Sequence, residues 1–305
     1  MTEGVVIPLL TGRDRWERVV DGWCDNSHAD AFTHTVRLVE GTPGADPDRG
    51  VEIVVVATPS PGYEIREARA TAVGDAVDPA VLAGCAKLGG VAMVAGLGRR
   101  LAEATGEGAG ASLVRDAVVE IARLARQVAK LPRDVADRAV AAGAAACRET
   151  DQAGFADLPD SCFTYSDASR ALFTSREVST PMTAELYSPR PGAPRVFVRR
   201  KVARLERLDG RVRLTHSMHD NVHGFDVVYE IDTATGRFVR AEHTTSRLPY
   251  AGVCTEPQRR MAGMLGETLD AGLAKRVQSH LGGRLGCAQL YDLTADLLKL
   301  VAAPV

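Results

Sequence analysis

The two halves of this 305-residue chain are similar to each other, and this internal similarity limits the folds that the chain can adopt. The stretch AGLGRR, residues 95–100, aligns with AGLAKR, residues 271–276, at an offset of 176 residues. The same offset brings further pairs together: Gly106 with Gly282, Gly110 with Gly286, Asp116 with Asp292, Glu120 with Asp296, and Arg123 with Lys299. A register kept over about thirty residues indicates a duplicated unit, so each half is expected to repeat the fold of the other.

Each half begins with strand patterns and ends with helical ones. Residues 50–73 and 224–246 each contain two runs of strand-forming side chains about a glycine-containing turn, which is the pattern of a β-hairpin. A further hairpin is predicted to turn at Asp209-Gly210, with a shorter counterpart at Asp21-Gly22. The sequence therefore predicts an α+β fold of two tandem repeats, each a small antiparallel sheet covered by helices on one face.

The halves are separated by a helical pattern that starts after Leu131-Pro132 and by a proline-rich turn at residues 187–195. We place the domain boundary near residue 150. Residues 1–150 are predicted to form the N-terminal repeat with a helical extension, and residues 151–305 the C-terminal repeat. The two sheets are expected to stay separate or to pair across a pseudo-twofold axis as a fused pseudo-dimer.

The composition argues against several classes of function. A formal net charge of -2 gives no basic field for nucleic acid, and the longest apolar window, residues 80–98, carries Lys87 and favours a buried helix over a membrane span. The N-terminal apolar run is short and broken by Pro8, unlike a signal peptide. Six cysteines without a C-x-x-C pair fit reduced thiols. We expect a cytoplasmic protein that binds neither nucleic acid nor a membrane.

Reactive residue types occur in the second half and not at the matching positions of the first. Gly286-Cys287 opens a helical segment where the first half has Gly110-Ala111, and Cys254 stands where the first half has Asp78. A thiol at a helix start faces backbone N–H groups, which favour the thiolate. The segment THSMHDNVHG adds four more polar candidates, His216, His219, Asp220 and His223.

These residues are predicted to gather at one place. His219 and His223 are expected on one face of a strand because side chains alternate with a period of two. The helices that start near Cys254 and Cys287 must pack on the same sheet, so both thiols are predicted to meet His223, with Asp220 or His219 as a fourth partner.

Three interpretations of such a cluster remain open. His219, His223, Cys254 and Cys287 would suit zinc or an iron-sulfur unit. Alternatively, His223 acts as a general base beside a cysteine nucleophile or acid, with His219 and Asp220 in support. The third interpretation is structural, because free cysteines are often buried as small hydrophobic side chains.

These residues give the second half a resemblance to DUF2889, a bacterial family of unknown function. The resemblance covers roughly residues 195–300 and rests on Asp220 and His223 at a hairpin, Cys254 after LPYAGV, and Gly286-Cys287 at a helix start. On this resemblance, the N-terminal half is a degenerate copy of the same unit.

The sequence departs from the family at Gln289, where a histidine is frequent. The order of elements is also similar to that of the iron-sulfur scaffold proteins of the NifU and IscU type. Their hairpin cysteine would fall at residues 221–223, where this chain has none. The likeness therefore implies a fold rather than an activity.

Eight Arg or Lys side chains stand with only two acids in residues 195–213. Cations along an exposed edge strand are one explanation. The functional alternative is that Arg199, Arg200 and Lys201 bind an anion, either the phosphates of a coenzyme A thioester or an acidic carrier protein. Tyr165 and Ser166 lie in an irregular segment of the kind that folds over a cleft, although such segments also serve as turns.

Taken together, these patterns predict a cofactor-independent enzyme of small-molecule or acyl metabolism, of hydrolase, lyase or cyclase type, with its site in a cleft between the repeats. The catalytic candidates are Cys254, Cys287, His223 and Asp220. The alternatives are a metal or iron-sulfur binding module and a non-catalytic protein that binds an acyl carrier protein or a coenzyme A thioester. A small molecule is the expected partner, and a monomer or homodimer the expected assembly.

Overall fold

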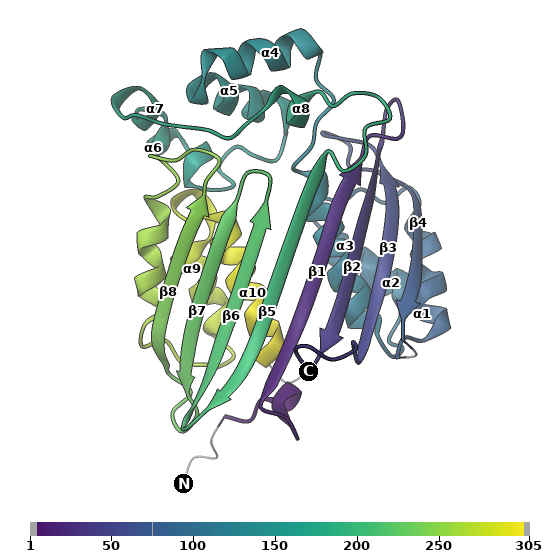
Figure 1. Cartoon of the computed structure of the whole chain (residues 1–305), viewed down its shortest axis with the longest axis vertical. Helices are drawn as coiled ribbons and strands as arrows, with labels where there is room; N and C mark the ends of the chain where they lie inside the picture. The colour runs from purple at the N-terminus through teal and green to yellow at the C-terminus, as the bar shows by residue number, and fades with distance from the viewer. Residues whose placement is uncertain (1–4, 75, 302–305) are drawn as a thin grey trace.

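The computed structural model describes residues 5–74 and 76–301 and contains an antiparallel sheet of eight strands (Figure 1). The strands are β1 (Arg15–Asp25), β2 (Phe32–Gly41), β3 (Arg49–Ala57), β4 (Ile65–Val73), β5 (Phe197–Leu208), β6 (Arg211–Asp220), β7 (Gly224–Asp232) and β8 (Phe238–Arg247). Their order is β4-β3-β2-β1-β5-β6-β7-β8, so two four-stranded meanders meet where β1 pairs with β5. The predicted α+β class is confirmed, and both halves contribute to one sheet.

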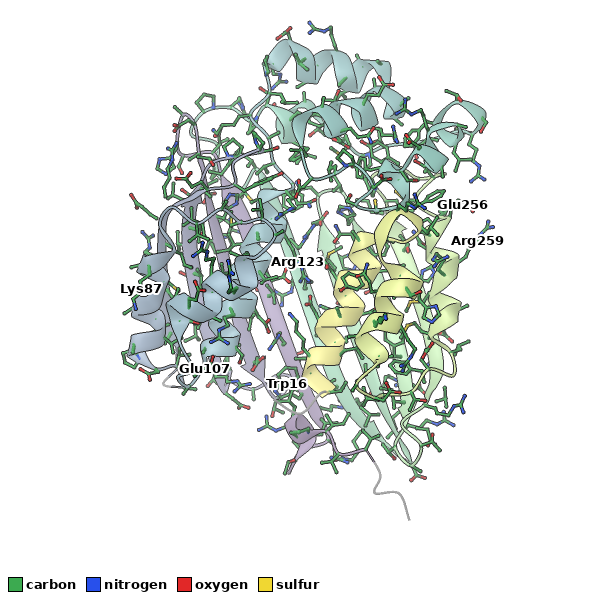
Figure 2. The ribbon with its side chains drawn as sticks, turned by 180° about the vertical axis from the view of Figure 1, so that it is seen from behind. Trp16, Lys87, Glu107, Arg123, Glu256 and Arg259 are labelled. Carbon is green, nitrogen blue, oxygen red and sulfur yellow. The ribbon has the colours of Figure 1, made fainter. Side chains whose placement is uncertain are left out.

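Helices cover one face of the sheet, as the view from behind shows (Figure 2). In chain order, with η for a 3-10 helix, the elements near the sheet are η1 (Pro8–Leu10), α1 (Pro79–Gly84), η2 (Cys85–Leu88), α2 (Leu97–Thr105), α3 (Ala111–Ala125), η4 (Pro257–Met264), α9 (Leu273–Leu281), η5 (Gly283–Leu285) and α10 (Ala288–Val301). The long helix α3 buries Val114, Val118 and Ile121 at helical spacing. Each such side chain contributes about 1.5–3 kcal/mol on burial, which holds the helix on the sheet. None of the helices in the described ranges has the length and apolar character needed to cross a bilayer.

Residues 127–196 form a cap that lies across one end of the strands (Figure 1). Its elements are α4 (Arg133–Ala142), α5 (Ala144–Gly154), η3 (Phe163–Tyr165), α6 (Asp167–Arg170), α7 (Leu172–Ser175) and α8 (Ala184–Tyr187). The helix predicted after Pro132 is present, but Gly143 divides it into α4 and α5. The φ of Gly143 is +92°, a left-handed value that favours glycine.

Strand β1 runs without a break through Asp21 and Gly22, so the turn predicted at this pair is wrong. Glycine has a different purpose there: a Cβ at Gly22 would lie 2.6 Å from Cδ1 of Leu124, because α3 packs directly on the strand. The turn at Asp209-Gly210 forms as expected between β5 and β6. The apolar window at residues 80–98 begins as the short α1 and η2 rather than as one helix.

Charged side chains fill the seam, which we define as the contact between the halves along β1, β5, α3 and α10. Lys201 lies 2.8 Å from Glu120 and 2.9 Å from Asp296, and all three are largely buried. Arg123 lies 2.6 Å from the same Asp296 and stands between the two groups of helices (Figure 2). The two meanders are therefore joined by a shared ion network as well as by backbone hydrogen bonds.

Two features of the fold repeat at the offset of 176 residues found in the sequence. Helices α2 and α9 begin and end at positions related by this offset. Across the seam, Arg123 lies 2.9 Å from Asp292, and the equivalent residues Lys299 and Asp116 lie 3.0 Å apart. The ion pairs therefore connect equivalent positions of the two halves.

Candidate functional site

A cavity of about 930 Å³, counted with the space at its mouth, lies between the cap, the β6–β7 turn and the start of α10. Apolar side chains such as Phe155, Leu158, Met182, Leu186 and Leu248 form much of its wall. An apolar lining with a few polar groups is typical of small-molecule sites. The polar side chains on the wall include Asp151, Cys162, Tyr165, His223, Cys254 and Cys287.

Three of the predicted site residues line this cavity. His223, Cys254 and Cys287 all line it, although they come from the β6–β7 turn, the segment before η4 and the start of α10. Gly286 allows the last of these placements, because a Cβ there would lie 1.9 Å from the carbonyl oxygen of Leu281. The turn between α9 and α10 can approach the end of α9 this closely only with glycine, which accounts for the Gly-Cys pair.

A buried ion pair supports His223. A carboxylate oxygen of Asp220 lies 3.1 Å from Nδ1 of His223 and also accepts hydrogen bonds from the backbone N–H groups of Val222 and His223. Nε of Arg199 donates to the same carboxylate at 2.8 Å, and both side chains are buried. Burial alone would raise the pKa of Asp220, but His223 and Arg199 hold it well below its usual range. The ionised carboxylate orients the imidazole with Nδ1–H toward it, which leaves Nε2 for a bound molecule.

His219 does not join this group. Strand β6 ends at Asp220, and the reversal at residues 221–223 removes the strand alternation on which the shared face depended. The side chain of His219 is 50% exposed and lies 3.5 Å from Asp226, away from the buried side of the strand. His216 is also separate, since its Nδ1 lies 2.9 Å from the carbonyl oxygen of Leu293 in the core.

Burial, rather than the position at a helix start, determines the pKa of the two cavity thiols. Burial raises the pKa of Cys287 to about 12 and outweighs the backbone N–H groups of Gln289 and Leu290, which act in the opposite direction. It also raises the pKa of Cys254, although Oγ1 of Thr164 lies 3.0 Å from its sulfur. Both groups are therefore neutral thiols at pH 7, which suits hydrogen bonding or packing better than nucleophilic attack.

The protonated state of Cys287 has a direct chemical consequence. At neutral pH its alkylation by iodoacetamide in the folded protein is expected to be at least about a hundredfold slower than that of free cysteine, because the thiolate is scarce. Peptide mapping by mass spectrometry measures the rate at this residue, and the same chain unfolded in denaturant is the control. Equal rates in the folded and unfolded chain would show that the thiol is ionised and accessible.

The cavity residues do not fit the predicted metal ligand sets. Within residues 5–74 and 76–301, no three His, Cys, Asp or Glu side chains converge as the ligands of a metal ion do. The positions of these side chains therefore give the zinc and iron-sulfur interpretations no support.

The three basic residues predicted to bind an anion are each paired within the protein. Alternation along β5 places Arg199 and Lys201 on the buried side, where they contact Asp220 and the seam carboxylates. Arg200 lies on the open side of the sheet and donates two hydrogen bonds to Asp21. The three cations do not share one surface, so the anion-binding alternative has no geometric support.

The cavity wall also contains a buried carboxyl group that was not predicted from the sequence. Asp151 of α5 accepts hydrogen bonds from the hydroxyl groups of Tyr165 and Tyr187, at 2.8 Å each, and of Tyr250. Arg148, one turn earlier on α5, donates instead to two backbone carbonyl groups of the cap. Burial raises the pKa of Asp151 to about 6, although the three hydroxyl groups favour the ionised form.

The C-terminal third of the chain matches a known family. Residues 203–302 match the family described as "Protein of unknown function (DUF2889)". The resemblance inferred from the motifs is confirmed for this segment. The DUF2889 match includes Asp220, His223, Cys254 and Gly286-Cys287, and it leaves out the first meander and the cap. No curated protein and no solved structure matches the chain.

Proposed function

We propose that this protein is an enzyme, independent of an organic cofactor, that moves a proton on an acyl or carbonyl substrate in the cavity as a step of a lyase or cyclase reaction. The observation that carries this proposal is the placement of His223 on the wall of an apolar cavity, with Nδ1 held by the buried Asp220 and Arg199 pair. Histidine is the side chain most often used as a general acid or base.

In the proposed step, Nε2 of His223 removes a proton from the carbon next to the carbonyl group. Asp220 stabilises the imidazolium ion that forms and keeps the ring oriented. The apolar wall limits the access of water to the reacting carbon. Hydrolysis through a cysteine nucleophile has less support, because burial keeps Cys254 and Cys287 protonated.

Hydrogen exchange next to a carbonyl group tests this proposal without knowledge of the natural substrate. The protein is incubated in D2O with a panel of uncharged ketones, aldehydes and thioesters, and deuterium uptake is measured by mass spectrometry. At least one compound is expected to exchange faster than in buffer. His223→Gln is expected to lower that rate by about 10²- to 10⁴-fold, the usual contribution of a general base.

His219→Gln is the matched control for this experiment. His219 is close in sequence but half exposed and paired with Asp226, so its loss should leave the exchange rate unchanged. The proposal fails if no compound exchanges faster than in buffer, or if His223→Gln exchanges as fast as the wild type.

We also infer that the two halves descend from one duplicated unit and that only the second kept the site residues. The matching bounds of α2 and α9 and the matching ion pairs across the seam support this inference. The domain boundary near residue 150 and the similarity to NifU and IscU type scaffolds stay predictions.

A further inference from the structure

We propose that Asp151 and Tyr165 are the acid group of this cavity and give a proton to the carbonyl oxygen of the substrate while His223 takes one from carbon. The inference rests on the proposed function and deepens it, because it requires a substrate oxygen that gains negative charge during the reaction. All three side chains line the same cavity.

The hydrogen bonds around Asp151 favour this role. Tyr187 donates to one carboxyl oxygen, and Tyr165 and Tyr250 donate to the other. These partners are neutral, and a buried carboxyl group with neutral partners is costly to ionise. The charge of Arg148 lowers the pKa of Asp151, but its guanidinium donates to two backbone carbonyl groups of the cap rather than to the carboxyl group.

Tyr165 connects this carboxyl group to the cavity. When Asp151 carries a proton, it must donate to one of the three hydroxyl groups, whose own proton is then free to point elsewhere. Tyr187 and Tyr250 are 1% and 0% exposed, whereas Tyr165 is partly exposed. Tyr187 also lines the cavity but is almost fully buried, so Tyr165 is the hydroxyl group best placed to present this proton to a bound molecule.

The proposed step balances within the cavity. The electron pair of the C–H bond becomes the C=C bond of an enol, and the π electrons of the C=O bond move to oxygen. That oxygen takes the hydroxyl proton of Tyr165, and Tyr165 takes the proton of Asp151. The products are the enol, protonated His223 and ionised Asp151. In D2O, His223 exchanges its proton for a deuteron, and return of this deuteron to carbon reverses the step with deuterium uptake.

A first test needs no substrate and compares urea unfolding of the wild type with that of Asp151→Asn from about pH 4 to about pH 7. Asp151 has its pKa raised from 3.8 to about 6 in the folded protein, so the stability that its protonated form contributes is present at low pH and lost as pH rises through 6. The variant is neutral throughout and should gain stability relative to the wild type as pH rises. Tyr165, Tyr187, Tyr250 and Arg148, which surround the carboxyl group, do not titrate in this range.

A second test uses the carbonyl exchange assay. Asp151→Asn is expected to lower the exchange rate by about 10²-fold or more, and Asp151→Glu to restore part of it. Tyr250→Phe leaves the cavity wall unchanged but removes a donor that lowers the pKa of Asp151. The pH above which exchange slows should therefore move upward in Tyr250→Phe, a shift that a packing defect would not produce.

The two tests separate this inference from the proposed function. A stability difference that is constant with pH, an undiminished exchange rate in Asp151→Asn, or an unmoved pH profile in Tyr250→Phe overturns the acid role. If the wild type exchanges no compound, the proposed function fails, and the unfolding comparison alone then shows whether Asp151 holds a proton in the folded protein.

Discussion

Asp220→Asn is expected to lower the free energy of unfolding by about 3–5 kcal/mol, the cost of leaving one member of a buried ion pair without its partner. The amide keeps an oxygen for the N–H groups of Val222 and His223 but turns an N–H group toward Arg199. Nη2 of Arg199 lies 2.6 Å from Asp220 as an ion contact and, within the described chain, has no aligned hydrogen bond that could replace it. Urea unfolding followed by circular dichroism measures the loss.

Asp21→Asn is the matched control on the other side of the sheet. Asp21 pairs with Arg200, the residue next to Arg199, but this pair is solvent-exposed. Its loss should change stability by no more than about 1 kcal/mol. The importance of the buried pair is refuted if Asp220→Asn and Asp21→Asn destabilise the protein equally.

Lys201→Met is expected to destabilise the protein by a similar amount, about 3–5 kcal/mol at pH 7, through the seam. The substitution keeps much of the side-chain length but leaves Glu120 and Asp296 without the ammonium group that lies between them. Arg204→Gln is the control, because Arg204 lies on the same strand and pairs with Glu17 on the open side of the sheet. It should cost no more than about 1 kcal/mol.

The pH dependence of this loss follows from the pKa values of the seam carboxyl groups. Burial alone would raise the pKa of Glu120, but Lys201 and Arg123 lower it from 4.5 to about 2, and Asp296 is also lowered. In the wild type, the stability that Glu120 contributes is present above about pH 4.5 and lost as pH falls toward 2. Lys201→Met raises these pKa values, so its deficit relative to the wild type should shrink on acidification. A deficit that grows at low pH would contradict this explanation.

Local patterns made several of the hairpins and helices predictable. The turn at Asp209-Gly210 and the helix after Pro132 depend on neighbouring residues, and both form. The single sheet depends on pairing between β1 and β5, which are far apart in sequence, so no local pattern indicates it. The turn predicted at Gly22 was wrong because glycine allows close packing of a helix on a strand as well as tight turns.

The same contrast between local patterns and long-range contacts explains which features of the site could be predicted. His223, Cys254 and Cys287 could be singled out because each lies near the start of a regular element, and the fold places all three on the wall of one cavity. The protonation of the thiols was not predictable, since it depends on burial by the cap. Asp151 had one signal that was overlooked: it shares a helical face with Ala144 and Cys147, which places a carboxyl group among buried side chains.

Strand β1 leaves the ribosome long before β5, yet the two are neighbours over most of their length. A nascent first meander therefore has an unpaired edge, of the kind on which partly made chains can aggregate, until β5 has emerged. Arg15, an exposed residue on that strand, places a charge at the unpaired edge and disfavours such contacts. Completion of the sheet is thus a late event in biosynthesis, and the cap is made before the edge is closed.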